Sequence, residues 1–549
     1  MHWIKQYRRG FLTGDVVAGI IVALMLIPQG MAYALVAGLP PVSGLYASLL
    51  PPVAYAVFGS SMVQSVGPMA ITSLMVGTAL GALAPSSSAL YTVLSQQLAL
   101  MTGVVLFICG VLRLGFLSSF FSRPVMSGFT SGAAVVIAVG QLKPVLGLSK
   151  EWSIAAIHGP SAIVGLVSLV LLALARYVLP SLLKSRGGWV SDILPKLAPI
   201  VVIVGSTFVV ALLGLDAQGV KTVGQIPAGL PAIGLSLSTE YWRTLLLPSL
   251  LIGFMVFLAS QSAAQTLAQK RGERINTNSE LLGLGAANLA SAVSGGFVVT
   301  GSISRSAVNY AAGANTPLAT LFSAGLIAIA LCLPNAWLSF IPLPAMAATI
   351  VVAVIGMIDF TTLTESWRHD RSDAATLVAT TVGVLVLGVE EGVLMGVVLS
   401  FATLIWRSSN PHIAIVGRLA GTEHFRNQAR YTVETLPHVL MLRIDSDLVF
   451  NNTVGVVDRI ESELLSRPDI RDLVLVLSAV NMVDTTALLA LIELNKNMRT
   501  QKRCLHLCEV KGPVMDRLKH SKLLDKDLTG QVFLSAAQAY QYLSGEVAA

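Results

Sequence analysis

Arg305 is the residue whose type and position point most directly to chemistry, because it lies inside a stretch otherwise suited to a lipid bilayer. A guanidinium group carries five N–H donors in a planar fork and holds an oxyanion by several hydrogen bonds at once. Serine hydroxyls flank it in the sequence, at Ser302, Ser304 and Ser306. The pattern favours an oxyanion-binding site. In the alternative interpretation, the segment is short and Arg305 reaches back to the cytoplasmic membrane surface.

Two apolar segments contain residues that interrupt a helix. Gly67-Pro68 lies inside one of them, and proline cannot continue a helix but suits the first position of a helix that begins there. The other reads Thr300-Gly301-Ser302, which is a β-branched residue, a glycine and a helix-capping serine. Each pattern predicts extended chain followed by a half-helix, which membrane proteins tolerate only where protein or water satisfies the backbone. Two such N-termini aimed at one point suit an anion.

Gln29 and Tyr33 are polar residues four positions apart, so they share one face of a helix next to Pro28. We consider them candidates for lining the same cavity as Arg305. In the alternative interpretation, they only join packed helices by hydrogen bonds.

The composition indicates which elements must position these residues. Of the 549 residues, 54% are hydrophobic and 12% are charged, and the mean hydropathy is +0.74. A soluble chain carries about a quarter charged residues. Residues 62–101 and 307–358 contain no Asp, Glu, Lys or Arg, and each run suits stretches of roughly 20 apolar residues that cross a bilayer. The composition therefore predicts a polytopic α-helical membrane protein.

Several classes of function are not indicated. The net charge of +7 comes without a basic stripe interleaved with aromatic residues, so we expect no nucleic-acid partner. The four cysteines have neither metal-ligand spacing nor the spacing of a disulfide framework. There is no catalytic triad or phosphate-cradling loop, and we expect neither an enzyme nor a bound cofactor or metal.

Hydrophobic windows predict fourteen membrane-spanning segments. They lie near residues 14–36, 40–58, 62–80, 92–112, 116–142, 160–179, 198–215, 244–268, 279–296, 298–312, 316–334, 339–358, 373–389 and 390–407. Fourteen segments divide into two sets of seven. An odd number in each set makes the second set insert upside down relative to the first, which is the inverted-repeat design.

Loop charges orient these segments. When the N-terminus is placed in the cytoplasm, fifteen Lys and Arg residues fall on that side and four on the other, so we expect both ends to be cytoplasmic. The cytoplasmic set is Lys5, Arg8, Arg9, Arg113, Arg123, Arg176, Lys184, Arg186, Lys196, Lys270, Arg271, Arg274, Arg368, Arg371 and Arg407, and the opposite set is Lys143, Lys150, Lys221 and Arg243.

The composition changes after Arg407. Residues 438–444 and 472–478 are apolar or alternating over strand lengths, and residues 454–465, 485–498 and 514–523 have helical periodicity. We predict a transmembrane domain over residues 1–407, a linker over 408–436, and an α/β domain over 437–549.

Several motifs resemble the SulP anion transporter family, the sulfate permeases and their relatives in animal solute carrier family 26. They are residues 27–34 (IPQGMAYA), 39–46 (LPPVSGLY), 55–60 (YAVFGS), 67–68 (GP), 122–129 (SRPVMSGF) and 301–309 (GSISRSAVN). The motifs occur in order over nearly the whole chain. The resemblance implies a seven-plus-seven inverted repeat, a core domain that moves like an elevator against a gate domain, and a homodimer.

The resemblance also implies where the anion binds. The family's site lies between the half-helices of the third and tenth segments and the first segment. Carried over to this sequence, it consists of Gln29, Tyr33, Gly67, Met69, Ile303, Ser304 and Arg305.

The chain departs from the family pattern in the eighth segment. Many members carry an acidic residue there, but residues 246–269 contain none, and Ala259 occupies the position. Arg305 is then left cationic without an intramembrane counter-ion, and the coupling ion stays open. Glu390 and Glu391 are the nearest other acids, and a solvated helix end is the alternative interpretation for them.

The C-terminal domain resembles a STAS domain, the fold of anti-sigma-factor antagonists. Residues 478–486 (SAVNMVDTT) match its strand-loop-helix motif, with Asp484 and Thr485 where a helix cap is expected. Thr486 matches the serine that is phosphorylated in the antagonists, so Asp484 and Thr486 are candidate regulatory residues. Ala487 replaces the usual following glycine.

Together these observations predict a secondary transporter for a small inorganic anion, sulfate or bicarbonate, with exchange against chloride as one mode. Three alternatives stay open: an anion channel, a transporter of dicarboxylates or other anions, and a membrane-tethered scaffold that senses anions. We expect the chain to reside in the plasma (inner) membrane. The expected partners are the anion, the lipid bilayer and a second copy of the chain, and a cytosolic protein is a candidate partner of the STAS domain.

Overall fold

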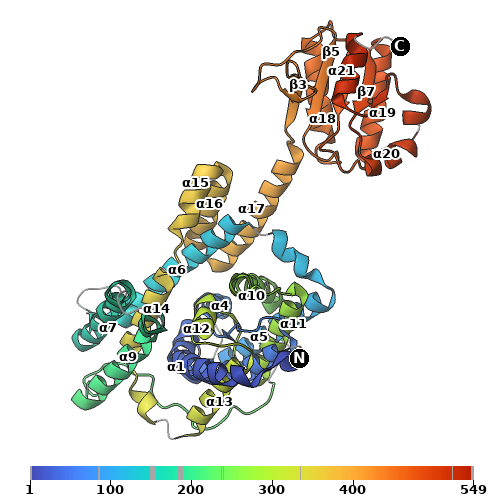
Figure 1. Ribbon diagram of the computed structural model, residues 1–549. Coiled ribbons are helices and arrows are strands. Elements are labelled where there is room, and N and C mark those ends of the chain that lie inside the picture. The colour runs from blue at the N-terminus through green and yellow to red at the C-terminus, as the bar shows by residue number, and fades with distance from the viewer. Residues whose placement is uncertain are drawn as a thin grey trace. The chain divides into compact units, whose positions relative to one another are not determined.

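The computed structural model describes residues 3–83, 87–120, 122–148, 156–183, 189–235, 238, 240–333, 336–521 and 523–545. Lys150, Lys184 and Arg186, which entered the orientation argument, lie outside these residues, as do the side chains of Lys5 and Lys196. The chain forms two compact units, Met1–Ser400 and Phe401–Ala549. Figure 1 labels their elements.

Helices make up nearly all regular structure of the first unit. They are α1 (Leu12–Val36), α2 (Pro41–Tyr46), α3 (Leu50–Phe58), α4 (Ala70–Ala82), α5 (Ser88–Val111), α6 (Arg123–Leu146), α7 (Gly159–Tyr177), α8 (Leu179–Leu183), α9 (Trp189–Leu213), α10 (Trp242–Arg271), α11 (Thr277–Val293), α12 (Ile303–Ala311), α13 (Leu318–Cys332), α14 (Leu343–Ile355), α15 (Phe360–His369), α16 (Arg371–Val386) and α17 (Val389–Ser409), which continues into the second unit. Short 3-10 turns are η1 (Trp3–Gln6), η2 (Arg9–Phe11), η3 (Leu114–Phe120) and η6 (Ala336–Phe340), and two two-residue strands complete the unit, β1 (Val66–Gly67) and β2 (Thr300–Gly301).

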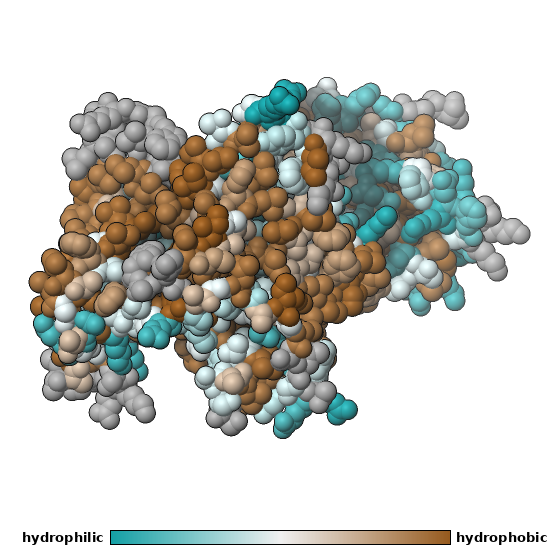
Figure 2. All heavy atoms as spheres, turned by 90° about the horizontal axis from the view of Figure 1, so that it is seen from below, coloured by the Kyte–Doolittle hydropathy of each residue, from teal (hydrophilic) through white to brown (hydrophobic). Residues whose placement is uncertain are grey.

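Within the described residues, eight helical stretches are long and apolar enough to cross a membrane. They are Arg9–Val36, Pro41–Phe58, Ser88–Val111, Arg123–Leu146, Gly159–Ser181, Trp242–Arg271, Leu343–His369 and Val389–Ser409, and shorter apolar helices occupy Ala70–Ala82, Leu197–Leu213 and Leu318–Cys332. Figure 2 shows apolar residues over much of the visible surface. Large apolar side chains such as Val201, Phe208 and Leu212 on α9 are exposed. A surface of this kind faces lipid, so the unit is a multi-pass membrane domain.

α15 is a helix that the hydrophobic windows did not predict. Its residues 360–369 are mostly polar, so they fall between two expected segments. The Asp359 carboxylate starts the helix by accepting hydrogen bonds from the backbone amides of Thr361 (3.1 Å) and Thr362 (3.0 Å). Hydropathy alone misses such a helix because it responds to apolar length and not to capping.

Small residues set the close packing around the centre of the first unit. α11 packs against α5 and α3, and α1 packs against α13. A Cβ atom on Gly285 of α11 would lie 2.6 Å from the backbone nitrogen of Phe107 on α5, so only glycine allows this approach. α4 and α12 both contact α1 and α10, and Figure 1 shows these four helices grouped together.

The second unit is an α/β domain built on a six-stranded sheet of order β4-β3-β5-β6-β7-β8. The strands are β3 (Ile413–Arg418), β4 (Phe425–Asn427), β5 (Val439–Ile444), β6 (Asp472–Val476), β7 (Cys504–Cys508) and β8 (Val532–Phe533), and the helical elements are α18 (Thr453–Ser466), α19 (Thr485–Thr500), α20 (Gly512–Lys519), α21 (Ala536–Ser544) and the π-helical turn η7 (Leu523–Asp527). β5, β6, β7 and β8 run parallel. The expected strands at 438–444 and 472–478 form β5 and β6.

The prediction of a linker over residues 408–436 was wrong. β3 pairs antiparallel with β5, beginning with Ile413 opposite Ile444, and β4 pairs antiparallel with β3. Ala414 and Val416 are buried in the core of the second unit. This short strand alternates in burial and is followed by polar turns, so its apolar content did not stand out from a loop.

Candidate functional site

Two short extended segments, β1 and β2, form the centre of the site. β1 and β2 pair antiparallel, with Val66 opposite Gly301 and Gly67 opposite Thr300. The amide of Ser302 also donates to the Ser65 carbonyl oxygen (3.2 Å). Neither segment is helical before α4 begins at Ala70 and α12 begins at Ile303. Because the paired strands lead directly into these helices, the two helix N-termini lie close together, where they present unpaired amides and the positive ends of their dipoles.

Arg305 lies in the first turn of α12 and is almost fully buried, with 1% of its surface exposed. Its Nη1 donates a hydrogen bond to the Pro68 carbonyl oxygen (2.6 Å). Its Nε and Nη2 have no partner within the described part of the chain, and no carboxylate there forms an ion pair with it. A buried guanidinium with unpaired donors is unfavourable unless a hydrogen-bond acceptor occupies the space beside it, and an anion offsets its charge as well.

The serine hydroxyls around Arg305 divide into structural and open ones. The Ser302 Oγ accepts from the Arg305 amide (3.5 Å) and caps α12. The Ser306 Oγ accepts from the Ser65 amide (2.9 Å) and joins α12 to β1. Ser304 and Ile303 are exposed at the start of the helix, and the Ser304 Oγ has only a long contact, 3.3 Å, with the Ser302 Oγ among the described residues. Ser304 is therefore the hydroxyl of the three that is best placed to reach a ligand.

The other residues expected at the site come from α1 and the start of α4. Tyr33 is a buried residue of α1, and α1 packs against α12, which carries Arg305. Gly67 lies against the guanidinium, since a Cβ atom there would be 3.3 Å from Nη2. Met69 is the extended N-cap residue of α4. Gln29 is half-buried on α1, one turn before Tyr33, and within the described residues no contact joins it directly to Arg305.

A second polar cluster was missed by the sequence analysis. Tyr55 on α3, Gln64 before β1, Ser260 on α10 and Glu280 on α11 are buried and joined by hydrogen bonds. The signal was present in the sequence, because Gln64 is a polar residue within the charge-free run 62–101 and Glu280 lies at the start of an apolar segment. It is Glu280, rather than Glu390 or Glu391, that hydrogen bonds connect to the strand beside Arg305.

One group in the second unit has the composition of a metal site. The ligand atoms of Asp472, Cys504 and His506 lie within 4.8 Å of one another. The Gln531 amide donates to His506 Nδ1 (3.0 Å), so the ring proton of the neutral histidine is on Nε2, which donates to Asp472 Oδ1 (3.1 Å). Burial and the Asp472 charge raise the pKa of the Cys504 thiol, which keeps it protonated. These groups suit a structural hydrogen bond better than a metal.

Asp484 has the capping role expected from its position. Its Oδ1 accepts from the Ala487 amide (2.8 Å) at the start of α19, and its Oδ2 accepts from the Phe450 amide (2.7 Å). Thr486 is exposed in the first turn of α19.

A multi-pass helical domain with a buried, unpaired arginine between two helix N-termini defines the class of a membrane anion transporter. The profile of the Sulfate permease family matches residues 12–380, and that of the STAS domain matches residues 430–539. The chain belongs to the sulfate permease family, whose members transport anions and are not enzymes, and it carries a C-terminal STAS domain.

Individual relatives agree with this assignment. A probable sulfate transporter of Mycobacterium tuberculosis is 35% identical over 98% of this chain and 96% of its own. The chloroplastic sulfate transporter 4.1 of Arabidopsis thaliana is 36% identical over 91% of this chain and 75% of its own. Murine solute carrier 26 family member A9, an anion transporter solved in the inward-facing state, has the same fold, with a TM-score of 0.90 at 21% identity, over 99% of this chain and 93% of its own. The transmembrane domain of the cyanobacterial bicarbonate transporter BicA covers 72% of this chain and 98% of its own, with a TM-score of 0.60 at 20% identity.

Proposed function

We propose that this protein is a secondary transporter that moves sulfate or bicarbonate through the membrane by elevator-type alternating access, with chloride as the exchange partner to test first. The observation that carries the proposal is the buried Arg305, whose Nε and Nη2 lack partners among the described residues beside two helix N-termini. A small oxyanion supplies the acceptors that these donors lack. Sulfate is the first candidate because relatives that are 35% and 36% identical to this chain are named as a probable sulfate transporter and a sulfate transporter.

The proposed membrane arrangement has fourteen spans in two inverted sets of seven. The first set runs from α1 to α9, and the second set runs from α10 to α17. The third span is β1 with α4, and the tenth is β2 with α12, each discontinuous near the middle of the membrane. The antiparallel pairing of β1 with β2 supports this arrangement, since it relates the corresponding spans of the two sets by opposite directions.

The anion occupies the space bounded by the two half-helices and α1. In this proposal Arg305 holds the charge, and Ser304 and the Ile303 backbone add donors from α12. Gly67 and Met69 bring the start of α4 close, and Gln29 and Tyr33 close the site from α1. Tyr33 is buried on α1, which packs against α12, whereas Gln29 is half-buried, so Tyr33 is the stronger of the two assignments.

The protein works as a homodimer in the plasma (inner) membrane, with both the N-terminus and the STAS domain in the cytoplasm. The loop charges support this orientation. In this proposal the STAS domain contacts a cytosolic protein partner. Asp484 and Thr486, at the N-terminus of α19, form its regulatory site.

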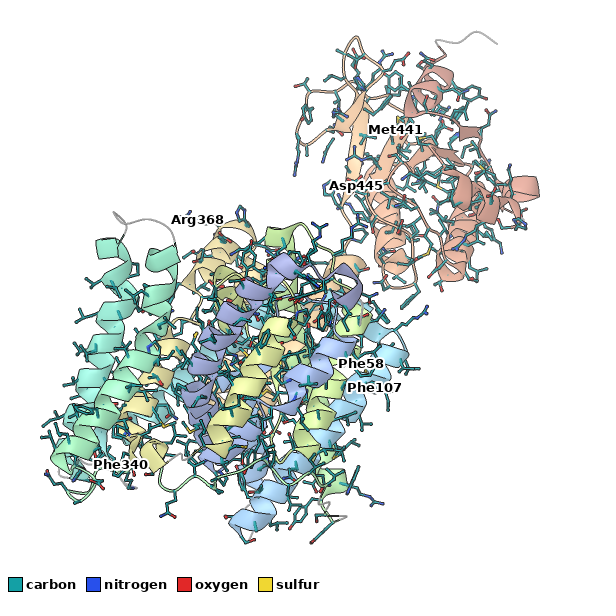
Figure 3. The ribbon with its side chains drawn as sticks, turned by 60° about the horizontal axis from the view of Figure 1, so that its bottom comes forward. Phe58, Phe107, Phe340, Arg368, Met441 and Asp445 are labelled. Carbon is teal, nitrogen blue, oxygen red and sulfur yellow. The ribbon has the colours of Figure 1, made fainter. Side chains whose placement is uncertain are left out.

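The experiment is uptake of labelled sulfate, bicarbonate and chloride into proteoliposomes, with and without imposed proton and sodium gradients. A transporter shows saturable uptake and counterflow of labelled anion. A channel shows no counterflow, and a sensing scaffold binds the anion without flux. Arg305→Ala abolishes uptake, whereas Arg368→Ala, on the exposed side of α15 and labelled in Figure 3, does not. Normal uptake by Arg305→Ala would remove this residue from the site.

A further inference from the structure

Glu280 is a fully buried carboxyl group that the proposed anion site does not use. It lies near the start of α11, with 0% of its surface exposed. The elements packed against α11 are α3, α5, α10 and η3. Their titratable and charged groups are Tyr55 on α3, Tyr91 and Cys109 on α5, and Arg243, Lys270 and Arg271 on α10, and η3 has none. Of these described groups, only Tyr55 forms a hydrogen bond with Glu280, and no cation pairs with it.

The two oxygens of Glu280 have different surroundings. Oε1 accepts hydrogen bonds from the Ser60 amide (2.9 Å), the Ser60 hydroxyl (2.7 Å) and the Ser61 amide (3.1 Å). Three donors at one oxygen favour the ionised carboxylate. Oε2 lies 2.7 Å from the Tyr55 hydroxyl oxygen.

The number of hydrogens available between Glu280, Tyr55 and Gln64 determines whether Glu280 Oε2 carries a proton. The Tyr55 hydroxyl oxygen is 2.7 Å from Glu280 Oε2 and 2.9 Å from Gln64 Oε1, but a phenol has one hydrogen to donate. The Gln64 amide nitrogen faces the Ser260 carbonyl oxygen (3.2 Å), which only accepts, and also the Ser260 hydroxyl, so in this orientation the amide oxygen faces Tyr55. With Gln64 in this orientation, both Tyr55 contacts are hydrogen bonds only when Glu280 Oε2 carries a proton and donates a hydrogen bond to Tyr55.

Each form of Glu280 is therefore supported by part of the structure. The donors at Oε1 stabilise the carboxylate, whereas with Gln64 in its present orientation the chain from Oε2 through Tyr55 and Gln64 to Ser260 is complete only in the neutral acid. When the proton is lost, Tyr55 donates to Glu280, and the oxygens of Tyr55 and Gln64 face each other without a hydrogen between them. Turning the Gln64 amide over lets its nitrogen donate to Tyr55 and its oxygen accept from the Ser260 hydroxyl, but it places that oxygen against the Ser260 carbonyl. Gln64 must move in either case.

Movement of Gln64 reaches the anion site through the backbone. Gln64 directly precedes Ser65 and β1, and its amide packs against Gly301 so tightly that a Cβ atom on Gly301 would overlap the amide nitrogen. The pairing of β1 with β2 places the Pro68 carbonyl oxygen on Arg305 Nη1. Phe58 at the end of α3 makes an edge-to-face contact with Phe107 on α5, and both are labelled in Figure 3.

We infer that Glu280 is a proton-binding positioning residue whose protonation, relayed through Tyr55 and Gln64, favours the anion-binding geometry around Arg305. This inference rests on the proposed function. It supplies a proton acceptor in a chain whose eighth segment lacks one. The proton comes from solution and stays on Oε2. By reciprocity, anion binding increases the affinity of Glu280 for the proton to the same extent.

The test measures equilibrium binding of labelled sulfate and labelled chloride to the purified full-length protein from acidic to mildly alkaline pH. These probes do not titrate over that range. In the wild type the affinity falls as pH rises, by up to about tenfold per pH unit for one linked proton. Glu280→Gln has a neutral side chain that both accepts from Ser60 and donates to Tyr55, so it binds tightly with no pH dependence. Glu365→Gln, an exposed acid on α15, keeps the wild-type profile.

The outcomes separate this inference from the proposed function. A wild-type affinity that does not change with pH, or a Glu280→Gln variant that keeps the wild-type slope, overturns the proton link and leaves the Arg305 site intact. Binding by Arg305→Ala at every pH overturns the site itself. A measurement on the wild type needs no variant to fold: adding sulfate or chloride to the weakly buffered protein takes up as much as one proton per anion. Absence of uptake at every pH overturns the inference.

Discussion

Gly67 lies directly beside the Arg305 guanidinium, with room for a hydrogen atom but little more. A Cβ atom at position 67 would come 3.3 Å from Nη2 and 3.5 Å from the Leu26 Cδ1 atom. Nη2 is one of the donors without a partner among the described residues. Because Gly67 has no side chain, the approach of an anion to Nη2 from this direction is not blocked.

Gly67→Ala is expected to weaken anion binding about tenfold, or about 1.4 kcal/mol, because the new methyl group crowds Nη2. Folding should be retained, since the contact is with the end of a side chain. The matched control is Gly81→Ala near the end of α4, where nothing lies within 4 Å of the new Cβ atom. Isothermal titration of both variants with the transported anion is the measurement. Equal affinities in the two variants would show that Nη2 does not contact the anion.

Local patterns in the sequence were sufficient to predict the interrupted helices and to select Arg305 as a candidate site residue. Pro68 and Gly301 interrupt helices because of their own backbone properties. An arginine within an apolar segment can be recognised from the sequence alone. The pairing of Val66 with Gly301 was not predictable, because residues far apart in sequence pair through a tertiary arrangement that a single sequence does not display. The proton count at Tyr55 likewise depends on atomic distances.

Tertiary pairing also accounts for the error over residues 408–436. β3 is six residues long, and its partner β5 comes after a stretch of polar residues. A short strand such as β3, which lies between β4 and β5, is identified by its pairing in the sheet, because its own hydropathy does not distinguish it from a loop.

The correction can be tested by hydrogen exchange on the full-length protein. Backbone amides within Ile413–Arg418 that face β5 or β4 should exchange slowly, because they are hydrogen-bonded in the sheet. The amides of residues 420, 421 and 423 in the following turn, which have no backbone hydrogen bond among the described residues, should exchange rapidly. Equally fast exchange in both stretches would restore the interpretation as a linker.

Asn288 is expected to hold the chain that enters β2. Its Nδ2 donates to the carbonyl oxygens of Leu284 (2.9 Å) and Val299 (3.0 Å), and its Oδ1 accepts from the Val299 amide (2.9 Å). Asn288→Ala leaves the buried N–H and C=O of Val299 without partners, which costs about 3 kcal/mol at typical values for unsatisfied groups. The measurement is thermal unfolding in detergent. Ser262→Ala, exposed on α10, is the control and should unfold like the wild type.

Asp484 should stabilise the STAS domain through its two hydrogen bonds rather than through its charge. Asp484→Ala removes the cap of α19 and the bond to the Phe450 amide, and loss of such a cap costs about 1 kcal/mol. Asp484→Asn keeps one acceptor oxygen and should lose less. Chemical unfolding of the full-length variants, followed by a signal from the STAS domain, gives both values. If the two variants are destabilised equally, the charge of Asp484 matters and the cap does not.

Thr486 is the position where a modification of the STAS domain should act. Its hydroxyl is exposed in the first turn of α19, two residues after the cap. A phosphate there adds negative charge near the positive end of the helix dipole, so α19 should gain stability, by about 0.3–1 kcal/mol for each such charge. Thr486→Glu imitates part of this charge and should raise the unfolding midpoint of the STAS domain, whereas Thr500→Glu at the opposite end of the helix should lower it. Phosphopeptide mass spectrometry of the protein from cells grown under varied anion supply should find modified Thr486. Finding the residue unmodified in every condition would show that the exposed hydroxyl is not a regulatory site, because the domain would then never carry the charge on which the switch depends.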